Sequence, residues 1–160
     1  MSRNLPQSEI LSLGKDVKIA IVTAEWNGRI TDELERGARE RLLASGVSDE
    51  NIRTLKVPGA VELTFGAALA IERLHPDAVI VFGAVVRGDT PHFDYVCMSA
   101  TQGVTSLNER GDVPVIFGVL TIDTEEQALE RIGGRCGHKG VEAADTALRM
   151  IAFKRNLIAE

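Results

Sequence analysis

The feature that most constrains the fold is a regular alternation of short apolar runs with amphipathic stretches. The runs at residues 17–24 and Ala78–Val86 are almost wholly apolar, as expected of strands that are covered on both faces. Shorter runs follow the same pattern at Ile52–Val57 and 113–120. Because a helical pattern follows each run, the sequence predicts an α/β fold in which a parallel sheet carries helices on both faces.

The amphipathic stretches also contain signals for where helices begin and end. Thr31 is a candidate N-cap, with Asp32 and Glu33 in the first turn, and Gly46 is a natural stop. Further helices are expected at residues 61–74, 92–108 and 124–132, and from the end of a glycine-rich loop at 133–140 to about 156. No linker or internal repeat divides the chain, so residues 1–160 are expected to form one domain.

The composition argues against several classes of protein. A net charge of -5, with lysines and arginines scattered, disfavours nucleic acid or an anionic membrane as the main partner. No apolar run approaches the roughly 18 to 20 residues of a membrane span, and residues 1–16 lack the apolar core of a signal peptide. Cys97 and Cys136 lack CxxC spacing, and the histidines and cysteines form no metal-ligand pattern. A cytoplasmic protein with reduced thiols is the prediction.

Chemically distinctive residues follow three of the four predicted strands. They lie in Glu25-Trp26-Asn27, in 57–62 (VPGAVE) and in 87–92 (RGDTPH). Ligands of such sheets bind outside the carboxyl ends of the strands, so this coincidence predicts a site at that edge. No GxGxxG or GxxxxGK[ST] motif accompanies it, which weakens a dinucleotide or nucleoside triphosphate interpretation.

Each of these residues has a plain interpretation and a functional one. Trp26 is either a core or interface aromatic or a stacking platform for a heteroaromatic ring. Glu62 either satisfies a helix dipole or accepts hydrogen bonds from a polyol.

The segment 88–91 (GDTP) is either an ordinary capped helix start, with Asp89 or Thr90 as cap and a proline at the first helical position, or a phosphate seat. His92 is either structural or a proton shuttle. Arg131, Arg135 and Lys139 either complement a helix C-terminus or, through Arg131, bind a phosphate.

Several blocks of the sequence resemble the signatures of lumazine synthases. Residues 26–31 (WNGRIT) resemble [F/W]NxxIT, 57–62 resemble VPGAxE, and 83–96 (GAVVRGDTPHFDYV) resemble GxVIRGxTxHFDYV. The block 114–121 (PVIFGVLT), with 126–128 (EQA), Arg131 and 138–140 (HKG), resembles PVxFGVLT…EQAxxR and NKG. The likeness covers about residues 17–150 in order. His138 stands where the family usually has asparagine, Val61 replaces a common aromatic, and Trp26 replaces the commoner phenylalanine.

The resemblance implies a flavodoxin-like three-layer sandwich with four parallel strands, whose N-terminal arm (residues 1–16) joins a neighbouring subunit's sheet. It implies condensation of 5-amino-6-ribitylamino-uracil with 3,4-dihydroxy-2-butanone 4-phosphate to 6,7-dimethyl-8-ribityllumazine in riboflavin biosynthesis, with phosphate and water released and no cofactor or metal. It further implies a pentamer, with a sixty-subunit shell favoured by the short 133–140 loop, and riboflavin synthase as a candidate partner. The alternatives are a non-catalytic flavin- or nucleotide-binding module and a structural shell protein.

The resemblance also assigns residues. His92 is the expected proton-transfer residue, and Phe117, Arg131 and Lys139 are expected to reach the site from an adjacent subunit. The residues expected to bind the aminouracil and its ribityl chain are Trp26, Asn27, Ala60, Val61, Glu62, Val85, Val86, Phe117 and Lys139. The residues expected to bind the phosphate are Asp89, Thr90 and Arg131.

Overall fold

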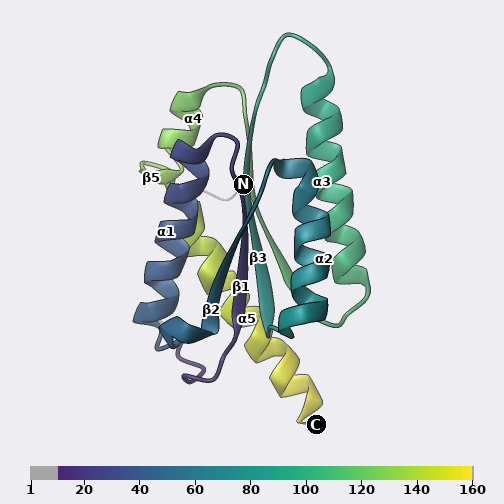
Figure 1. Cartoon of the computed structure of the whole chain (residues 1–160). Helices are drawn as coiled ribbons and strands as arrows, with labels where there is room; N and C mark the ends of the chain where they lie inside the picture. Colours follow the sequence, from purple (N-terminus) through teal and green to yellow (C-terminus); the bar gives the residue numbers. More distant parts are fainter. Residues whose placement is uncertain (1–10, 160) are drawn as a thin grey trace.

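Four parallel strands form the centre of the protein, in the order β2-β1-β3-β4. They are β1 (Ile19–Ala24), β2 (Ile52–Val57), β3 (Ala78–Val86) and β4 (Val115–Ile122). In the computed structural model, which describes residues 11–159, helices connect these strands and cover the sheet (Figure 1). The predicted α/β fold with a flavodoxin-like parallel sheet is therefore confirmed.

The helices form one layer on each face of the sheet (Figure 1). Helices α1 (Gly28–Ala44) and α5 (Lys139–Ile158) cover one face. Helices α2 (Leu63–Leu74) and α3 (His92–Glu109) cover the other. The smaller elements are the 3-10 turns η1 (Asp49–Asn51) and η2 (Ala60–Glu62), the short helix α4 (Glu125–Leu129), and an antiparallel hairpin of β5 (Ile132–Gly134) and β6 (Gly137–His138).

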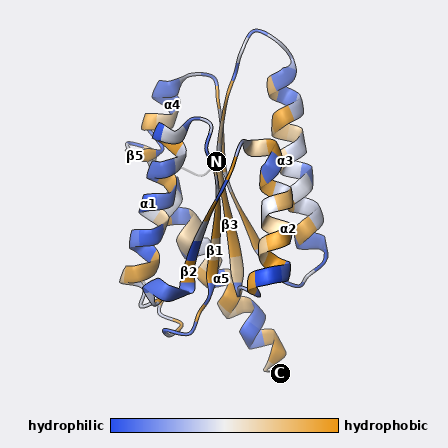
Figure 2. Ribbon diagram, in the orientation of Figure 1, coloured by the Kyte–Doolittle hydropathy of each residue, from blue (hydrophilic) through white to orange (hydrophobic). Residues whose placement is uncertain are grey.

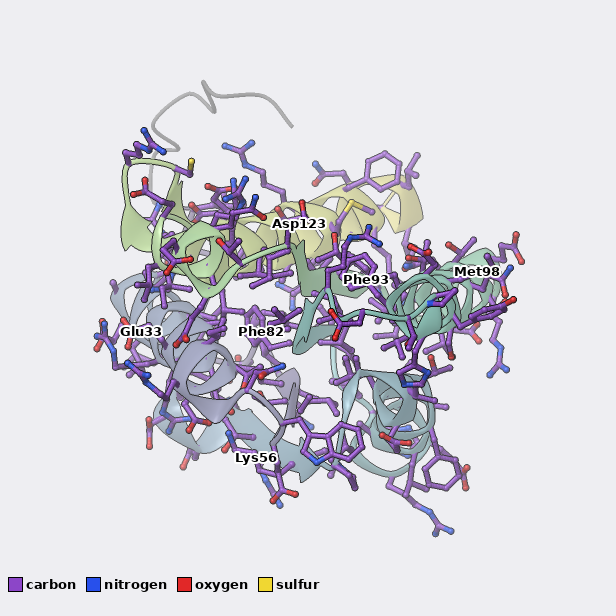
Figure 3. The ribbon with its side chains drawn as sticks, turned by 90° about the horizontal axis from the view of Figure 1, so that it is seen from above. Glu33, Lys56, Phe82, Phe93, Met98 and Asp123 are labelled. Carbon is purple, nitrogen blue, oxygen red and sulfur yellow. The ribbon has the colours of Figure 1, made fainter. Side chains whose placement is uncertain are left out.

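Each face of the sheet has its own apolar core, because successive side chains of a strand point to opposite faces. Along β1, Ile19 and Ile21 pack toward α1 and α5, whereas Ala20 and Val22 pack toward α2 and α3. Strands β1, β3 and β4 are correspondingly hydrophobic over most of their length (Figure 2). The edge strand β2 also contains the polar residues Arg53, Thr54 and Lys56. Phe82, fully buried, lies in the middle of the molecule between the two helical layers (Figure 3).

The prediction that Thr31 is the N-cap of the first helix is wrong. Helix α1 begins four residues earlier, at Gly28, after the N-cap residue Asn27, which has a left-handed conformation with φ of 59°. Thr31 is fully buried, and its hydroxyl donates a hydrogen bond of 2.8 Å to the carbonyl of Ala24. Asn27 can adopt this conformation, and so allow a tight turn between β1 and α1, because asparagine tolerates the left-handed region better than most residues. Thr31 therefore ties the helix back to the end of β1.

Other elements also differ from the prediction. Strand β4 starts later and runs to Ile122, because its last residues pair with the end of β3. Helix α4 is shorter than expected and ends at Leu129, so Arg131 lies just beyond it. The glycine-rich segment 133–140, expected as a loop, contributes the β5–β6 hairpin and the start of α5.

The predicted N-terminal arm falls mostly on residues 1–10, which lie outside the described residues. Of its remainder, Leu11 and Leu13 are partly buried and pack against the core under α1 and α5. Between residues 11 and 159, no helix has the length and apolar character needed to span a membrane.

Candidate active site

Trp26 lies at the carboxyl end of β1 and is not a core residue. Its backbone N–H donates to the carbonyl of Pro58 at 3.0 Å, which joins the ends of β1 and β2. The side chain is 69% exposed, and its ring packs over Gly59, where an added Cβ would lie 2.7 Å from the ring. The tight contact with Gly59 supports one side of the ring, and the high exposure leaves aromatic surface open to stacking.

The side chain of Glu62 also lies next to Gly59. Its Oε2 atom lies 3.1 Å from the position that a Cβ of Gly59 would take. This oxygen is buried, and it has no hydrogen-bond partner among the described residues. A buried acceptor without a partner destabilises the folded state by about 1 to 3 kcal/mol, so its retention points to a ligand that donates to it.

Asn27 has a structural role. Its Nδ2 atom donates a hydrogen bond of 2.7 Å to the carbonyl of Ala84, which fastens the β1–α1 turn to β3. The neighbouring wall of the site contains Ala60, which is buried, and Val61 and Val86, which are exposed. The structure thus brings these predicted residues to the carboxyl ends of adjacent strands.

Arg87 fixes the loop that follows β3, a role that sequence reasoning missed. Its Nε donates to Asp123 at 2.8 Å, its Nη1 lies 3.4 Å from Asp94, and its guanidinium lies 4.0 Å from the centre of the Phe93 ring. The hydrogen bond to Asp123 raises the pKa of Arg87 above its ordinary value. Figure 3 shows Asp123 and Phe93 near each other at this end of the sheet. The sequence signal for this role was the placement of an arginine and an aspartate after the ends of two adjacent strands.

The loop anchored by Arg87 leads into α3 and presents exposed polar groups. Asp89, Thr90 and His92 are all exposed. The hydroxyl of Thr90 accepts the backbone N–H of His92 at 3.4 Å. The N-cap position of α3 is nevertheless Pro91, so the prediction that Asp89 or Thr90 is the N-cap is wrong. Pro91, predicted at the first helical position, lies immediately before α3. We call Trp26, Gly59, Glu62 and His92 the carboxyl-edge cluster, because all four lie in the segments that follow the carboxyl ends of β1, β2 and β3.

A second set of predicted residues lies along the opposite edge strand. A groove of about 1060 Å³ runs between β4 and α5, and we call it the β4 groove. Phe117, Arg131 and Lys139 all line it, whereas Trp26 and Glu62 do not.

Arg131 and Lys139 both bond to groups of their own chain. Arg131 Nη1 donates to the carbonyl of Gln127 at 2.7 Å, and Lys139 Nζ lies 2.7 Å and 2.9 Å from the two oxygens of Glu142. The structure therefore separates the predicted site residues into two surfaces of one protomer. Over residues 11–159, no group of three or more metal-ligating side chains is present.

The fold and the carboxyl-edge cluster define the class of the protein. It is a flavodoxin-like α/β protein. Its exposed aromatic ring, its imidazole and a carboxylate oxygen that has no partner within residues 11–159 suit recognition of a small polar ligand. Residues 16–155 match the family model of 6,7-dimethyl-8-ribityllumazine synthase.

Relatives of that name match at high identity. The enzyme of Porphyromonas gingivalis is 55% identical over 147 residues, which is 92% of this chain and 91% of the relative. That of Parabacteroides distasonis is 52% identical over 153 residues, covering 94% and 96% of the two chains. That of Campylobacter jejuni is 45% identical over 147 residues, covering 92% and 96%. The chain belongs to the 6,7-dimethyl-8-ribityllumazine synthase family.

Proposed function

We propose that this chain condenses 5-amino-6-ribitylamino-uracil with 3,4-dihydroxy-2-butanone 4-phosphate to give 6,7-dimethyl-8-ribityllumazine, phosphate and water, in riboflavin biosynthesis. Membership of the family carries the proposal. The carboxyl-edge cluster supports it, because a flat ring that bears a polyol needs an aromatic surface beside an unpaired acceptor. Trp26 provides that surface and Glu62 provides that acceptor.

In this proposal the carboxyl-edge cluster binds the aminouracil. Trp26 stacks on the pyrimidine, and Glu62 accepts hydrogen bonds from ribityl hydroxyls. Backbone groups of the adjoining strand ends hold the polar ring edge and the chain, with the Oδ1 of Asn27 available to assist. These backbone groups belong to Ala60, Val61, Val85 and Val86.

The second substrate binds through its phosphate. The backbone at Asp89 and the hydroxyl of Thr90 contact it at the start of α3, and the guanidinium of Arg131 pairs with it. A charge-assisted hydrogen bond of this kind contributes about 1.5 to 3 kcal/mol. His92 lies beside this phosphate position and moves the protons that imine formation, phosphate elimination and ring closure require. A histidine of this kind adds about 10² to 10⁴-fold, whereas holding two reactants together can supply an effective molarity of about 10⁵ M or more.

We further propose that each active site lies between two subunits. The carboxyl-edge cluster of one subunit would face the β4 groove of its neighbour, which brings Phe117, Arg131 and Lys139 to the bound substrates. Two different surfaces that complete each other form a heterologous interface, which closes into a ring.

Exposed apolar side chains on both sides of the protomer support such an assembly. Phe65 on α2 and Tyr95 on α3 are exposed on one side, and Phe117 and Phe153 are exposed at the β4 groove on the other. Monomeric proteins rarely leave large apolar patches uncovered. We propose a pentamer, and a shell of twelve pentamers with riboflavin synthase as partner; a light-scattering mass near five chains would refute the shell. A cytoplasmic location remains a prediction.

One assay tests the catalytic proposal. Purified protein is incubated with both substrates, and the appearance of lumazine fluorescence is followed. We expect fluorescence that requires both substrates. Flavin or nucleotide binding without turnover would favour a binding module, and large assemblies with neither activity nor binding would favour a structural shell protein.

A further inference from the structure

His138 caps helix α5 through its imidazole. Its Nδ1 atom accepts backbone N–H groups from Gly140 at 3.2 Å and from Val141 at 3.4 Å. Two donors at Nδ1 require that this nitrogen carries no proton, so the proton of the neutral ring is on Nε2. That atom is buried and lies 3.7 Å from the Oε1 of Glu33.

The imidazole occupies a recess that only a glycine can provide. It lies over Gly37 in the middle of α1, where an added Cβ would come within 2.1 Å of its Cε1. A glycine inside a helix destabilises it by about 0.5 to 1 kcal/mol relative to alanine, so a packing reason is expected. Gly140 makes a second close approach, because its added Cβ would lie 2.1 Å from the carbonyl oxygen of Leu34. Helix α5 therefore starts against the backbone of α1, with the His138 ring between them.

Glu33 completes the pocket around the ring. It lies one turn before Gly37 on α1, and Arg36 Nε donates to its carboxylate at 3.0 Å. Hydrogen bonding to Arg36 lowers the pKa of Glu33 below its ordinary value, so the carboxylate is charged. A charged carboxylate facing Nε2 favours the tautomer that leaves Nδ1 free to cap. Figure 3 shows Glu33 on the α1 side of the molecule, away from Phe93 and Met98.

This cap is connected directly to the segments that carry Arg131 and Lys139. Lys139 is the next residue, and its backbone N–H donates to the carbonyl of Arg131 at 2.8 Å. His138 itself pairs with Ile132, the residue after Arg131, in the β5–β6 hairpin. A displacement of the imidazole would therefore shift the segments that carry Arg131 and Lys139 together.

We propose that His138 is a positioning residue for substrate binding, acting through the α5 cap and the Gly37 recess to hold Arg131 and Lys139 at the β4 groove. This inference rests on the proposed function, in which these two cations contact the substrates. It goes beyond that function because the proposed function gives His138 no contact with either substrate.

The test first fills the Gly37 recess, so that the imidazole no longer fits, and then shortens the side chain at position 138 to remove the clash. Gly37→Ala should force the imidazole out of its recess and raise KM for both substrates roughly fivefold, the ratio that corresponds to loss of a typical helix cap. The turnover number kcat should change less than twofold, because His92 lies on the other surface. Adding His138→Asn should restore KM, since asparagine is a good cap and its shorter side chain leaves the recess empty. His138→Leu, which has no acceptor, should raise KM as Gly37→Ala does.

Hydrogen exchange gives a readout that does not depend on catalysis. The amides of Gly140 and Val141 should exchange faster in Gly37→Ala and His138→Leu, and at the wild-type rate in the Gly37→Ala/His138→Asn double variant. Faster exchange with unchanged KM would overturn the proposal and leave a purely structural cap. A double variant that is folded but not rescued would overturn it as well. Absence of lumazine formation by the wild-type protein would instead reject the proposed function.

Discussion

The carboxyl-edge cluster and the β4 groove differ in how their polar groups are satisfied. In the cluster, Glu62 has a buried oxygen without a partner among the described residues, and the Trp26 ring is largely exposed. In the groove, Arg131 and Lys139 are already bonded to a carbonyl and a carboxylate of their own chain. One surface offers unused hydrogen-bonding capacity, and the other offers cations that are ordered in advance.

This difference fits the roles that we propose for the two surfaces in substrate binding. Long cationic side chains lose about 1.5 to 2 kcal/mol of rotamer entropy when they are ordered, so ordering them before binding lowers the cost of capturing a phosphate. An unpaired acceptor destabilises the free protein, and a donating ligand removes that penalty. The substrate with many hydroxyls suits the cluster, and the substrate with the phosphate suits the groove.

The largest expected effect concerns His92, which would give the carboxyl-edge cluster a catalytic role that the β4 groove lacks. His92→Ala should lower kcat by about 10 to 10³-fold and leave aminouracil binding nearly intact, because proton transfer would be lost and stacking retained. Steady-state kinetics and a binding titration measure the two effects. His75→Asn is the control, since His75 is exposed in a left-handed conformation that asparagine tolerates. An unchanged kcat in His92→Ala would remove this residue from the mechanism.

The groove is tested by removing its guanidinium. Arg131→Ala should raise KM for the sugar phosphate tenfold or more, given about 1.5 to 3 kcal/mol for a charged hydrogen bond. Arg135→Ala is the matched control, because Arg135 is exposed and pairs with Glu130 instead of lining the groove. Equal effects of the two substitutions would show that general charge, and not a specific contact, attracts the phosphate.

Mixing these variants tests whether the two surfaces meet across subunits. Chains with His92→Ala and chains with Arg131→Ala are co-assembled in equal amounts. About one interface in four then receives an intact His92 from one chain and an intact Arg131 from the other. Activity should recover to roughly a quarter of wild type under conditions where each variant alone is nearly inactive. Verified mixed assemblies without recovery would mean that both residues serve the same subunit's site.

Removal of the stacking ring of Trp26 should have a smaller effect than the substitutions above. Trp26→Ala should weaken aminouracil binding by about 1 to 3 kcal/mol, the range for stacking of a base on an aromatic side chain. Trp26→Phe keeps an aromatic face and should retain most of the affinity. Calorimetric titration compares the three proteins, and equal affinity for wild type and Trp26→Ala would exclude a stacking role.

The smallest expected effect concerns the stability of the free protein. Glu62→Gln should leave the free energy of unfolding unchanged or raise it by up to about 1 kcal/mol, because a neutral amide is easier to bury without a partner than a charged oxygen. The same change should weaken aminouracil binding. Denaturant unfolding with and without the ligand gives both values. A clear loss of stability in the free protein would show that Glu62 has a structural partner and is not held in reserve for a ligand.

The sequence by itself determined the sheet. The strands at Ile52–Val57 and Ala78–Val86 match their predicted bounds. For Ala78–Val86 the reason is that a strand buried on both faces is a continuous apolar run that local sequence displays. The positions of Trp26 and Glu62 at the carboxyl edge follow from that pattern. Long motifs such as 83–96 were specific enough to predict the family, which the comparisons confirmed.

Only the tertiary structure decided what individual polar residues do. Thr31 has the local signature of a cap, yet it is buried against Ala24. Asn27 bonds to Ala84, and His138 occupies a recess at Gly37, in each case across a long stretch of sequence. Such contacts are set by the packing of separate elements, which the spacing of neighbouring residues does not encode. The resemblance assigned Arg131 and Lys139 to an adjacent subunit, and only the structure showed that they line one groove between β4 and α5.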